Sequence, residues 1–311
     1  MDSTVYIPNL NGRARLRMTL ESVRRQTTPC HVVVVDNGST DGTVEMLARD
    51  YPEHEVVALT ENLGFGRALN QAIRAHGTGP VILLNNDVIL EPEFIEEITR
   101  TAESTGAEMV ASVLLRADRP GEIDSAGIVA DDETLMAFDF LEGLPVQAVE
   151  SAAAPLGPSG GAALYDRECF LRAGGFDEEI FAYYEDLDLA LRMRIDGCRC
   201  ALAKNARGTH LRSATLGPRS ATKYGITGWS RGYLIRRYGL MESPRGILRT
   251  LAFESLVCLG QILFERTASG IRGRVKGFRA GRDMPRRPLP TEGLSHISAR
   301  RAIRDRLQRL P

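Results

Sequence analysis

The 311-residue sequence lacks the marks of a disulfide-stapled or nucleic-acid-binding protein. Its five cysteines are an odd number scattered through a long chain, which is typical of reduced thiols. The formal net charge is −1, so no overall electrostatic field attracts nucleic acid. No nucleic-acid partner is therefore expected.

The sequence also has little that predicts export or a membrane span. Polar MDST leads directly into a strand-like VYI segment, which is not a signal-peptide pattern. The longest apolar stretch, residues 247–264, contains Arg249 and Glu254, so it is a poor membrane span but a reasonable surface-lying helix. These features predict a cytoplasmic protein that is at most peripheral on the inner face of the plasma membrane.

What the first third of the chain does contain is a regular alternation of strand and helix patterns. The β-branched run HVVVVD is typical of a strand buried on both faces of a parallel sheet. The predicted strands are residues 5–7, 31–36, 56–59 and 81–87. Short connections between alternating elements predict an α/β fold with an open, mostly parallel central sheet. Ligands bind such sheets beyond the carboxyl ends of the strands. Four polar loops would gather there: 8–12, 36–42, 62–66 and 85–87.

The remaining chain is less regular. Residues 117–150 contain nine Asp or Glu against Arg119 alone, and we interpret them as a solvated excursion, with part of an acceptor site as the alternative. A strand and helix follow at 162–173, then a helix with an apolar stripe from Leu187 to Ile195. The segment CRCALA predicts one more strand, which leads to His210.

Three groups of residues could carry chemistry. Glu185, Asp186 and Asp188 open a helix, where the dipole alone favours acids, but the same field keeps a carboxylate ionised for use as a general base. Asp87 ends an apolar strand, where it could bind a divalent cation on a diphosphate or simply cap a loop. His210 alone is more typical of a packed histidine, yet it would suit a Mn²⁺-type site beside Asp87.

Taken together, these segments resemble the family 2 inverting glycosyltransferases with a GT-A fold, in particular their rhamnosyltransferase-like branch. The ordered series is far more specific than any single motif, and it covers about residues 1–240. The matching text is PNLNG (8–12), VDNGSTDGT (35–43), ENLGFGRALN (61–70), LLNNDV (83–88), the stretch 159–197 and His210.

The resemblance implies a role for each matched residue. Asp186 would be the general base, and Glu185 would orient the acceptor over a floor formed by Gly160 and Gly161. A divalent cation, Mn²⁺ or Mg²⁺, would be held by Asp87 and His210. The nucleotide-sugar would be bound by Pro8, Asn9, Asn11, Asp36, Asn37, Asn62, Gly64, Phe65, Asn70, Asn86 and Asp87. Asp188 is expected to be structural.

Two departures from the family pattern stand out. The metal motif is Asn-Asn-Asp at residues 85–87, so a single carboxylate has to serve. An expected Arg-Asn pair is replaced by Arg231-Gly232, which leaves the role of that segment open.

The implied function is transfer of a sugar to a hydroxyl of a glycan or lipid-linked acceptor in cell-surface polysaccharide synthesis, with L-rhamnose from dTDP-rhamnose as the first choice of donor. A galactofuranosyl- or other hexosyltransferase using a UDP-sugar would look much the same. A nucleotidyltransferase would start with a Gly-x-Gly-x-Arg loop, which PNLNG is not. The alternative from another class is a non-catalytic protein that binds nucleotide-sugars.

The expected domain organisation is a catalytic domain at 1–215, with a donor half at about 1–115 and an acceptor half at about 116–215. Residues 216–311 are expected to form a mobile loop and a helical extension. Within it, residues 266–287 hold eight Arg or Lys against Asp283 alone. Three interpretations of 245–287 stay open: contact with an anionic membrane, a solvated basic tail, and a contact between subunits of a homo-oligomer.

Overall fold

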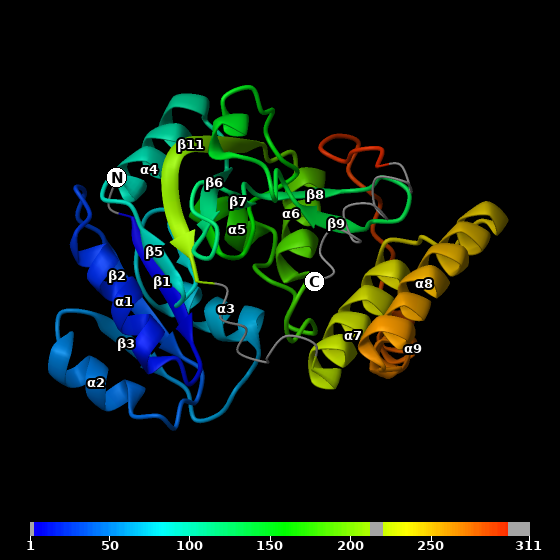
Figure 1. The fold of residues 1–311 in the computed structure, drawn as a ribbon, viewed down its shortest axis with the longest axis horizontal. Helices are drawn as coiled ribbons and strands as arrows, with labels where there is room; N and C mark the ends of the chain where they lie inside the picture. Colours follow the sequence, from blue (N-terminus) through cyan, green and yellow to red (C-terminus); the bar gives the residue numbers. More distant parts are fainter. Residues whose placement is uncertain (1–2, 212–219, 298–311) are drawn as a thin grey trace.

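The computed structural model describes residues 3–211 and 220–297 (Figure 1). Strands form one sheet in the order β3-β2-β1-β4-β10-β6-β11-β5, with β7 added beside β6, and a separate pair β8-β9. The strands are β1 (Thr4–Asn9), β2 (His31–Asp36), β3 (Glu55–Ala58), β4 (Val81–Leu84), β5 (Val88–Leu90), β6 (Met109–Arg116), β7 (Ile123–Ser125), β8 (Ile128–Ala130), β9 (Ala137–Asp139), β10 (Ala162–Tyr165) and β11 (Cys200–His210). The helices are α1 (Arg13–Arg24), α2 (Thr43–Asp50), α3 (Phe65–Ala75), α4 (Phe94–Thr105), α5 (Arg167–Arg172), α6 (Glu185–Ile195), α7 (Ala221–Arg237), α8 (Pro244–Glu265) and α9 (Ser269–Ala280), with short 3₁₀ turns at Val146–Val149 and Gly281–Asp283.

The N-terminal half of the sheet is parallel, as the alternating pattern predicts. Strand β1 pairs in parallel with β2 and β4, and β2 pairs in parallel with β3. Successive side chains enter two different cores: Val5 and Ile7 pack with residues of α1 and α4, whereas Tyr6 packs with residues of α3. Burial on both faces explains why these strands are continuous apolar runs.

The second half of the sheet corrects the prediction of a mostly parallel sheet. Strand β10 is inserted antiparallel between β4 and β6, and β5 is antiparallel to β11. The predicted strand 81–87 is also shorter than expected, because β4 ends at Leu84 and the turn formers Asn85 and Asn86 redirect the chain. Strand β5 then pairs at the opposite end of the strand order.

The acidic region 117–150 is not a solvated excursion throughout. It contains β7, β8 and β9, and Ile123 and Ile128 are buried. Two of its carboxylates, Asp124 and Asp131, are each 5% exposed. The count of acidic residues was misleading because it does not distinguish buried carboxylates from solvated ones.

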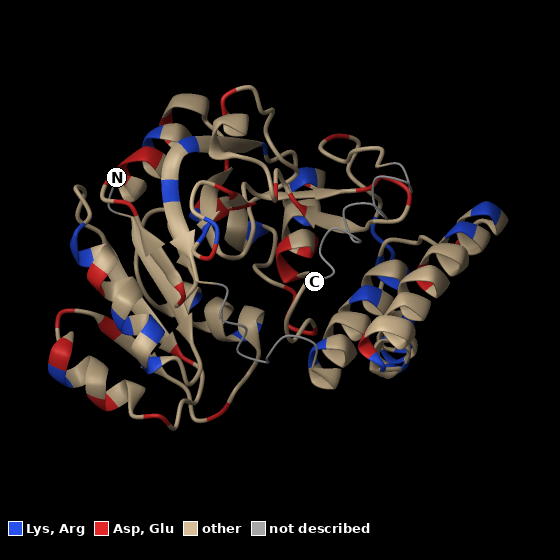
Figure 2. Cartoon of the chain, viewed as in Figure 1, with Lys and Arg blue, Asp and Glu red and all other residues tan. Residues whose placement is uncertain are grey.

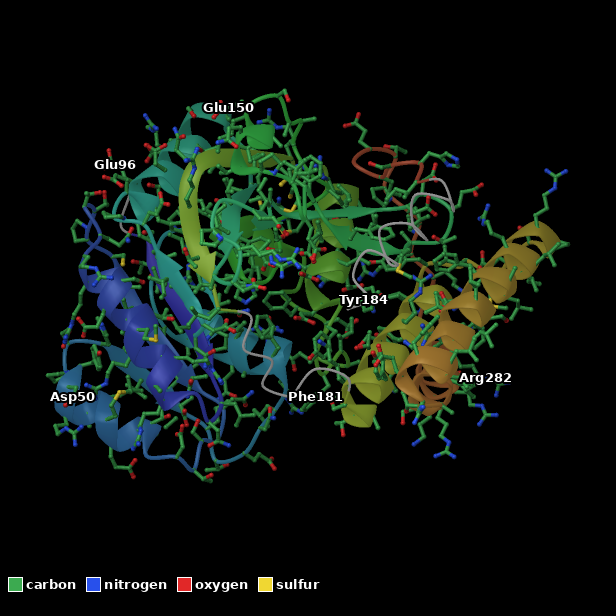
Figure 3. The ribbon with its side chains drawn as sticks, viewed as in Figure 1. Asp50, Glu96, Glu150, Phe181, Tyr184 and Arg282 are labelled. Carbon is green, nitrogen blue, oxygen red and sulfur yellow. The ribbon has the colours of Figure 1, made fainter. Side chains whose placement is uncertain are left out.

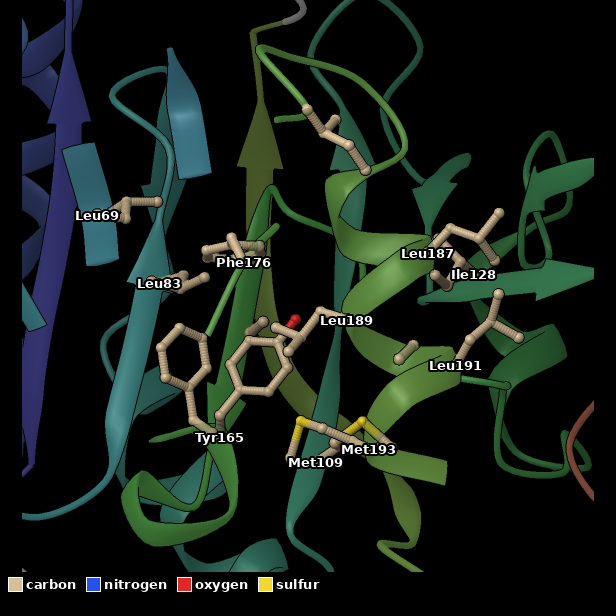
Figure 4. Close-up of a cluster of buried hydrophobic side chains, with 14 of the residues drawn as sticks. Leu69, Leu83, Met109, Ile128, Tyr165, Phe176, Leu187, Leu189, Leu191 and Met193 are labelled. Atoms are coloured by element: carbon tan, nitrogen blue, oxygen red, sulfur yellow. The ribbon is translucent and has the colours of Figure 1, made fainter. Parts of the chain in front are cut away.

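Helix α6 is buried along most of its length. Leu187, Leu189, Leu191 and Met193 belong to the same core as Tyr165 of β10 (Figure 4). Its first turn carries the acidic cluster.

The C-terminal helices lie beside the part of the chain that contains the sheet, with α8 on the side away from the sheet (Figure 1). The sequence predicts two helices in this extension, at about 227–240 and 245–265, and they are confirmed as α7 and α8. The basic stretch forms α9. The polar, Gly/Ser/Thr-rich stretch 211–225 is the predicted mobile loop. Residues 212–219 of it lie outside the described residues, and its last part, from Ala221, begins α7. Apolar residues at 294, 297, 303, 307 and 310 predict a final amphipathic helix. It is not formed up to residue 297, where Ser295 instead bridges to Asp131, and the rest of it lies outside the described residues.

Candidate active site

The carboxyl ends of β1 and β2 meet in a polar network, as the sheet topology predicts. Asn9 donates through Nδ2 to Asp36 Oδ1 at 3.1 Å and accepts through Oδ1 from Asn86 Nδ2 at 2.6 Å. Asp36 also accepts from the backbone N–H of Ser39, and Asn11 accepts from the backbone N–H of Thr40. Asn9 and Asp36 are almost fully buried, so they shape the loops of this edge.

A second part of this edge is the loop before α3. Asn37 donates to Asn62 Oδ1 at 3.0 Å and to the carbonyl of Gly64 at 3.1 Å. Gly64 has a φ of 88°, and a side chain there would lie 2.7 Å from the carbonyl of Phe181. The next residue, Phe65, donates its N–H to that same carbonyl at 2.9 Å. The donor-side loop is therefore joined directly to the segment that precedes α6. Pro8 is half-buried on β1, one residue before Asn9.

The side chain of Asn70 points to the turn before α6 and not to this edge, so its expected help in holding the nucleotide stays a prediction. Its side chain is 1% exposed and lies against the turn before α6. It donates to the carbonyl of Phe176 at 2.8 Å and accepts from the N–H of Phe176 at 2.9 Å. Asn70 therefore clamps α3 to the segment that leads to the acidic cluster.

The structure brings Asp87 and His210 together. Strand β5 pairs with β11 so that His210 lies opposite Val88, next to Asp87. His210 Nε2 lies 3.3 Å from Asp87 Oδ1, and His210 Nδ1 lies 2.6 Å from Asp124 Oδ2. Sequence reasoning missed Asp124, because it sits in the acidic region 117–150 and no spacing connects it to His210.

Burial alone would lower the pKa of His210, but hydrogen bonds and charges from Asp124 and Asp87 outweigh it and raise the pKa to about 9. The same arrangement fits a divalent cation. A histidine whose Nδ1 hydrogen is held by a carboxylate presents Nε2 to a metal, as in carboxylate–histidine–metal sites. Asp87 would supply the oxygen ligand, so these two residues could hold Mn²⁺ or Mg²⁺ with Asp124 orienting the imidazole.

A second group of side chains also satisfies a simple ligand geometry. Asp131, Asp132 and His296 have ligand atoms within 4.8 Å of one another. The oxygens of Asp131 already accept from the backbone N–H groups of Thr134 and Ile297, however, which is a loop-capping role. We therefore place the candidate metal centre at Asp87 and His210.

The backbone just before the acidic cluster has an unusual conformation. Tyr183 and Tyr184, which precede α6, have φ values of 67° and 70°, a left-handed conformation that is costly for residues other than glycine. The sequence gives no signal for this. Figure 3 shows Phe181 and Tyr184 on the side of the catalytic domain nearer to α7, and Ala182 accepts a hydrogen bond from Ser230 of that helix.

The first two acids of α6 sit in different surroundings. Asp186 is half-buried, and accepts from the N–H of Gly160 at 3.0 Å and from the N–H of Leu187 at 2.8 Å. Glu185 is 8% exposed, and no donor among the described residues reaches its Oε2. Burial, with the adjacent charge of Asp186, raises the pKa of Glu185 to about 8. Burial also raises the pKa of Asp186, but the backbone N–H groups oppose that rise.

Glu185 therefore keeps its proton at pH 7, and the backbone N–H groups of Gly160 and Leu187 favour placing the negative charge on Asp186. A carboxylate with a raised pKa is a stronger base than a free aspartate while it remains ionised. This division fits the predicted roles of Asp186 as base and Glu185 as a neighbour that contacts an acceptor.

The inserted strand β10 connects the two halves of the site. The residues that lead into it, Gly160 and Gly161, bond to opposite sides: Gly160 holds Asp186, and the carbonyl of Gly161 accepts from the N–H of Asn85 at 2.9 Å. A side chain on Gly161 would lie 2.7 Å from Leu114, which explains the glycine. The turn that carries Asp87 and the helix start that carries Asp186 are thus joined through two residues of main chain, Gly160 and Gly161.

Asp188 has the structural role expected of it. It is fully buried, with Arg192 Nε at 2.7 Å, Arg237 Nε at 3.2 Å and the hydroxyl of Tyr238 at 2.9 Å. The departure at Arg231-Gly232 also has a structural account. Arg231 is buried, and its Nε lies 2.7 Å from Glu254 Oε1 of α8.

The chain has the fold of the GT-A glycosyltransferases. Similar solved structures include the mannosyltransferase PcManGT from Pyrobaculum calidifontis in complex with GDP-Man and Mn²⁺, at a TM-score of 0.54 and 18% identity over 99% of this chain and 79% of that one. At this identity the likeness concerns the fold.

Sequence comparisons then give the family. Residues 4–132 match the model of glycosyl transferase family 2. An N-acetylglucosaminyl-diphospho-decaprenol L-rhamnosyltransferase of Mycobacterium tuberculosis is 28% identical over 212 residues, 61% of this chain and 69% of the relative. The succinoglycan biosynthesis protein ExoA of Rhizobium meliloti is 26% identical over 266 residues, 83% of this chain and 78% of that protein. Residues 4–132 therefore carry a glycosyl transferase family 2 domain, and the relatives support a family 2 glycosyltransferase of the rhamnosyltransferase-like type.

Proposed function

We propose that the chain is a metal-dependent, inverting glycosyltransferase of cell-surface polysaccharide synthesis, which moves a sugar from a nucleotide diphosphate to a hydroxyl of a glycan or lipid-linked acceptor. The observation that carries the proposal is the junction at Gly160 and Gly161, where one glycine holds Asp186 and the next bonds to the turn of Asp87. L-rhamnose from dTDP-rhamnose is the first choice of sugar donor, because a relative of this chain is named as an L-rhamnosyltransferase.

The residues divide the chemistry between them. Asp186 takes the proton of the acceptor hydroxyl, whose oxygen attacks the anomeric carbon from the side opposite the leaving group. The bond from that carbon to the diphosphate oxygen breaks, and the electron pair leaves with the nucleotide diphosphate, which inverts the anomeric centre. A cation held by Asp87 and His210 would neutralise the charge that develops on the diphosphate. Buried Glu185, neutral at pH 7, can donate a hydrogen bond to the acceptor.

A nucleotide site is supported at the carboxyl edge of β1 and β2, where ligands bind in sheets of this kind. The polar loops there contain Asn9, Asn11, Asp36, Asn37 and Asn62. Gly64 and Phe65 lie beside the segment before α6, and Phe65 approaches the place of Gly160. The donor would therefore extend from the edge of β2 toward Asp186.

The test is a thermal-shift screen of dTDP-rhamnose, UDP-sugars and GDP-mannose with Mn²⁺ or Mg²⁺, followed by a transfer assay with the donor that binds. A product with inverted anomeric configuration, assigned by NMR, is expected. Retention of configuration would refute the base assignment. Metal-dependent binding without either transfer or hydrolysis would favour the alternative of a non-catalytic nucleotide-sugar-binding protein. Selection of a UDP-sugar would identify a galactofuranosyl- or other hexosyltransferase.

A further inference from the structure

Helix α8 has its apolar and polar sides reversed relative to a helix of a soluble protein. Its buried residues include Thr250, Glu254 and Gln261. Its exposed residues are mostly large and apolar: Leu248 is 73% exposed, Leu263 62% and Phe264 61%. Ten of the fifteen exposed large hydrophobic side chains of the described chain lie on α8 or α9. Such an accumulation marks an interaction surface.

By length and composition α8 is also the one described helix that could cross a membrane, and only 28% of its apolar window is buried. That criterion is weak alone. Crossing is opposed by the polar network beneath the helix, where Glu254 pairs with Arg231 and Arg274 at 2.7 and 2.6 Å. The helix is therefore better suited to lie along a membrane than to pass through it.

Helix α9 places a basic stripe next to this apolar surface. Its glycines Gly273 and Gly277 face α7 so closely that a side chain on either would meet backbone atoms of α7 at about 2 Å. Ile271, Val275 and Phe278 line an apolar groove of about 660 Å³ shared with α8. By helical spacing, Arg272, Lys276 and Arg279 follow on the side of that groove away from α7, and all three are exposed.

The charge of residues 245–287 indicates which kind of partner this surface would bind. Residues 245–287 contain ten Lys or Arg against three Asp or Glu, and one of the acids, Glu254, is already paired with two arginines (Figure 2). A symmetric dimer through this face would set like charges against each other. An anionic lipid surface supplies both complements, acyl chains for α8 and phosphates for α9.

We propose that α8 and α9 form a docking surface for an anionic phospholipid membrane. The exposed apolar side of α8 enters the boundary between headgroups and acyl chains, and Arg272, Lys276 and Arg279 meet the lipid phosphates. The inference goes beyond the proposed function, because it concerns where the enzyme is held and not which reaction it performs.

Helix α7 links this surface to the candidate active site. On one side Arg231 pairs with Glu254 of α8. On the other, Arg237 lies 3.2 Å from Asp188 of α6, the helix that carries Asp186. Docking would therefore fix the orientation of the acceptor half of the site relative to the membrane. A lipid-linked acceptor, part of the proposed function, would be presented from that surface.

The experiment is flotation of the full chain with vesicles of phosphatidylglycerol or of phosphatidylcholine, without any sugar donor. A basic-stripe variant carries Arg272→Gln, Lys276→Gln and Arg279→Gln, and an apolar variant carries Leu256→Ser, Leu263→Ser and Phe264→Ser. A matched control removes three exposed charges from the catalytic domain, by Arg49→Gln, Arg100→Gln and Arg119→Gln. Unchanged melting temperatures would establish that the variants are folded.

We expect the wild type and the matched control to float with phosphatidylglycerol and much less with phosphatidylcholine. Each basic residue contributes about fivefold to partitioning, so the basic-stripe variant should lose roughly a hundredfold. The apolar variant should also stay unbound. Donor hydrolysis in solution should be the same for all proteins, which separates this result from failure of the proposed function.

Three results would overturn the proposal: equal binding to both lipids, flotation of both variants like wild type, or no vesicle binding by wild type. Sedimentation velocity without lipid tests the alternative that a second copy of this chain covers the surface. If wild type self-associates and the apolar variant does not, while vesicles are not bound, the surface is a contact between copies of this chain.

Discussion

Replacing Glu185 by glutamine should remove a specific part of the pH dependence of stability. The folded protein keeps the proton of Glu185 up to about pH 8, whereas an unfolded chain releases it near the ordinary value of 4.5. Between these values the folded state binds more protons than the unfolded state, so stability falls as the pH rises. The contribution is fully present below pH 4.5 and lost once the pH passes about 8.

The size of the effect follows from the same shift. One pKa unit corresponds to about 1.4 kcal/mol, so the wild type should lose up to about 3 kcal/mol between pH 5.5 and 8.5 through this group. For a chain of this length that is a fall in melting temperature of roughly 5 °C. Glu185→Gln has no proton to release here, and its melting temperature should change less over the same range.

The assay is thermal unfolding of wild type and Glu185→Gln in matched buffers at both pH values. The comparison uses the difference between the two pH values, so a constant effect of the glutamine on packing cancels. Parallel pH dependences for the two proteins would refute the assignment of Glu185 as the neutral member of the pair. Glu185→Asp offers a second check, because it keeps an ionisable group.

The remaining predictions concern the roles of single carboxylates. Asp186→Asn should lower transfer by about 10²–10⁴-fold and leave donor affinity nearly unchanged by calorimetry, and near-normal transfer would exclude it as the base. Asp188→Asn, two residues further along α6, should instead lower the melting temperature, because it leaves the buried guanidinium of Arg192 without its charged partner. Asp87→Ala, or chelation, should weaken donor binding; unchanged affinity would rule out its metal role. Asp124→Asn should weaken metal affinity by about 10–100-fold without removing a ligand, measured by titration with Mn²⁺.

The sequence predicted the first half of the fold because local patterns determine it. Buried β-branched runs alternating with helical patterns require crossovers, and crossovers make parallel pairs. The sequence did not predict the strand directions of the second half, because an apolar strand such as β10 has the same pattern in either direction. Its insertion between β4 and β6 depends on contacts far apart in the chain.

The candidate site was predictable to a similar extent. Asp87, Asp186 and His210 were singled out by their residue type and place, and the structure brings Asp87 and His210 together. Asp124 was not found, because a carboxylate that supports a histidine from a distant strand has no fixed spacing. The clamp formed by Asn70 was missed for the same reason: a motif identifies a residue but not the partner of its side chain.

The arrangement at the start of α6 explains how two adjacent carboxyl groups acquire different roles. Neighbouring carboxylates in a shared buried site cannot both be ionised cheaply. Backbone N–H groups of Gly160 and Leu187 donate to Asp186 and favour its charge, whereas burial and that adjacent charge raise the pKa of Glu185 to about 8, so Glu185 retains the proton. Two left-handed tyrosines, each costing on the order of 1–3 kcal/mol, lead directly into these two acids. Gly160 and Gly161 lead into strand β10, and the carbonyl of Gly161 accepts from the N–H of Asn85. The same main chain therefore also aligns the carboxylate of Asp186 with the turn that carries Asp87. Burial of Glu185 and the backbone hydrogen bonds to Asp186 together therefore support the proposal that Asp186 is the base.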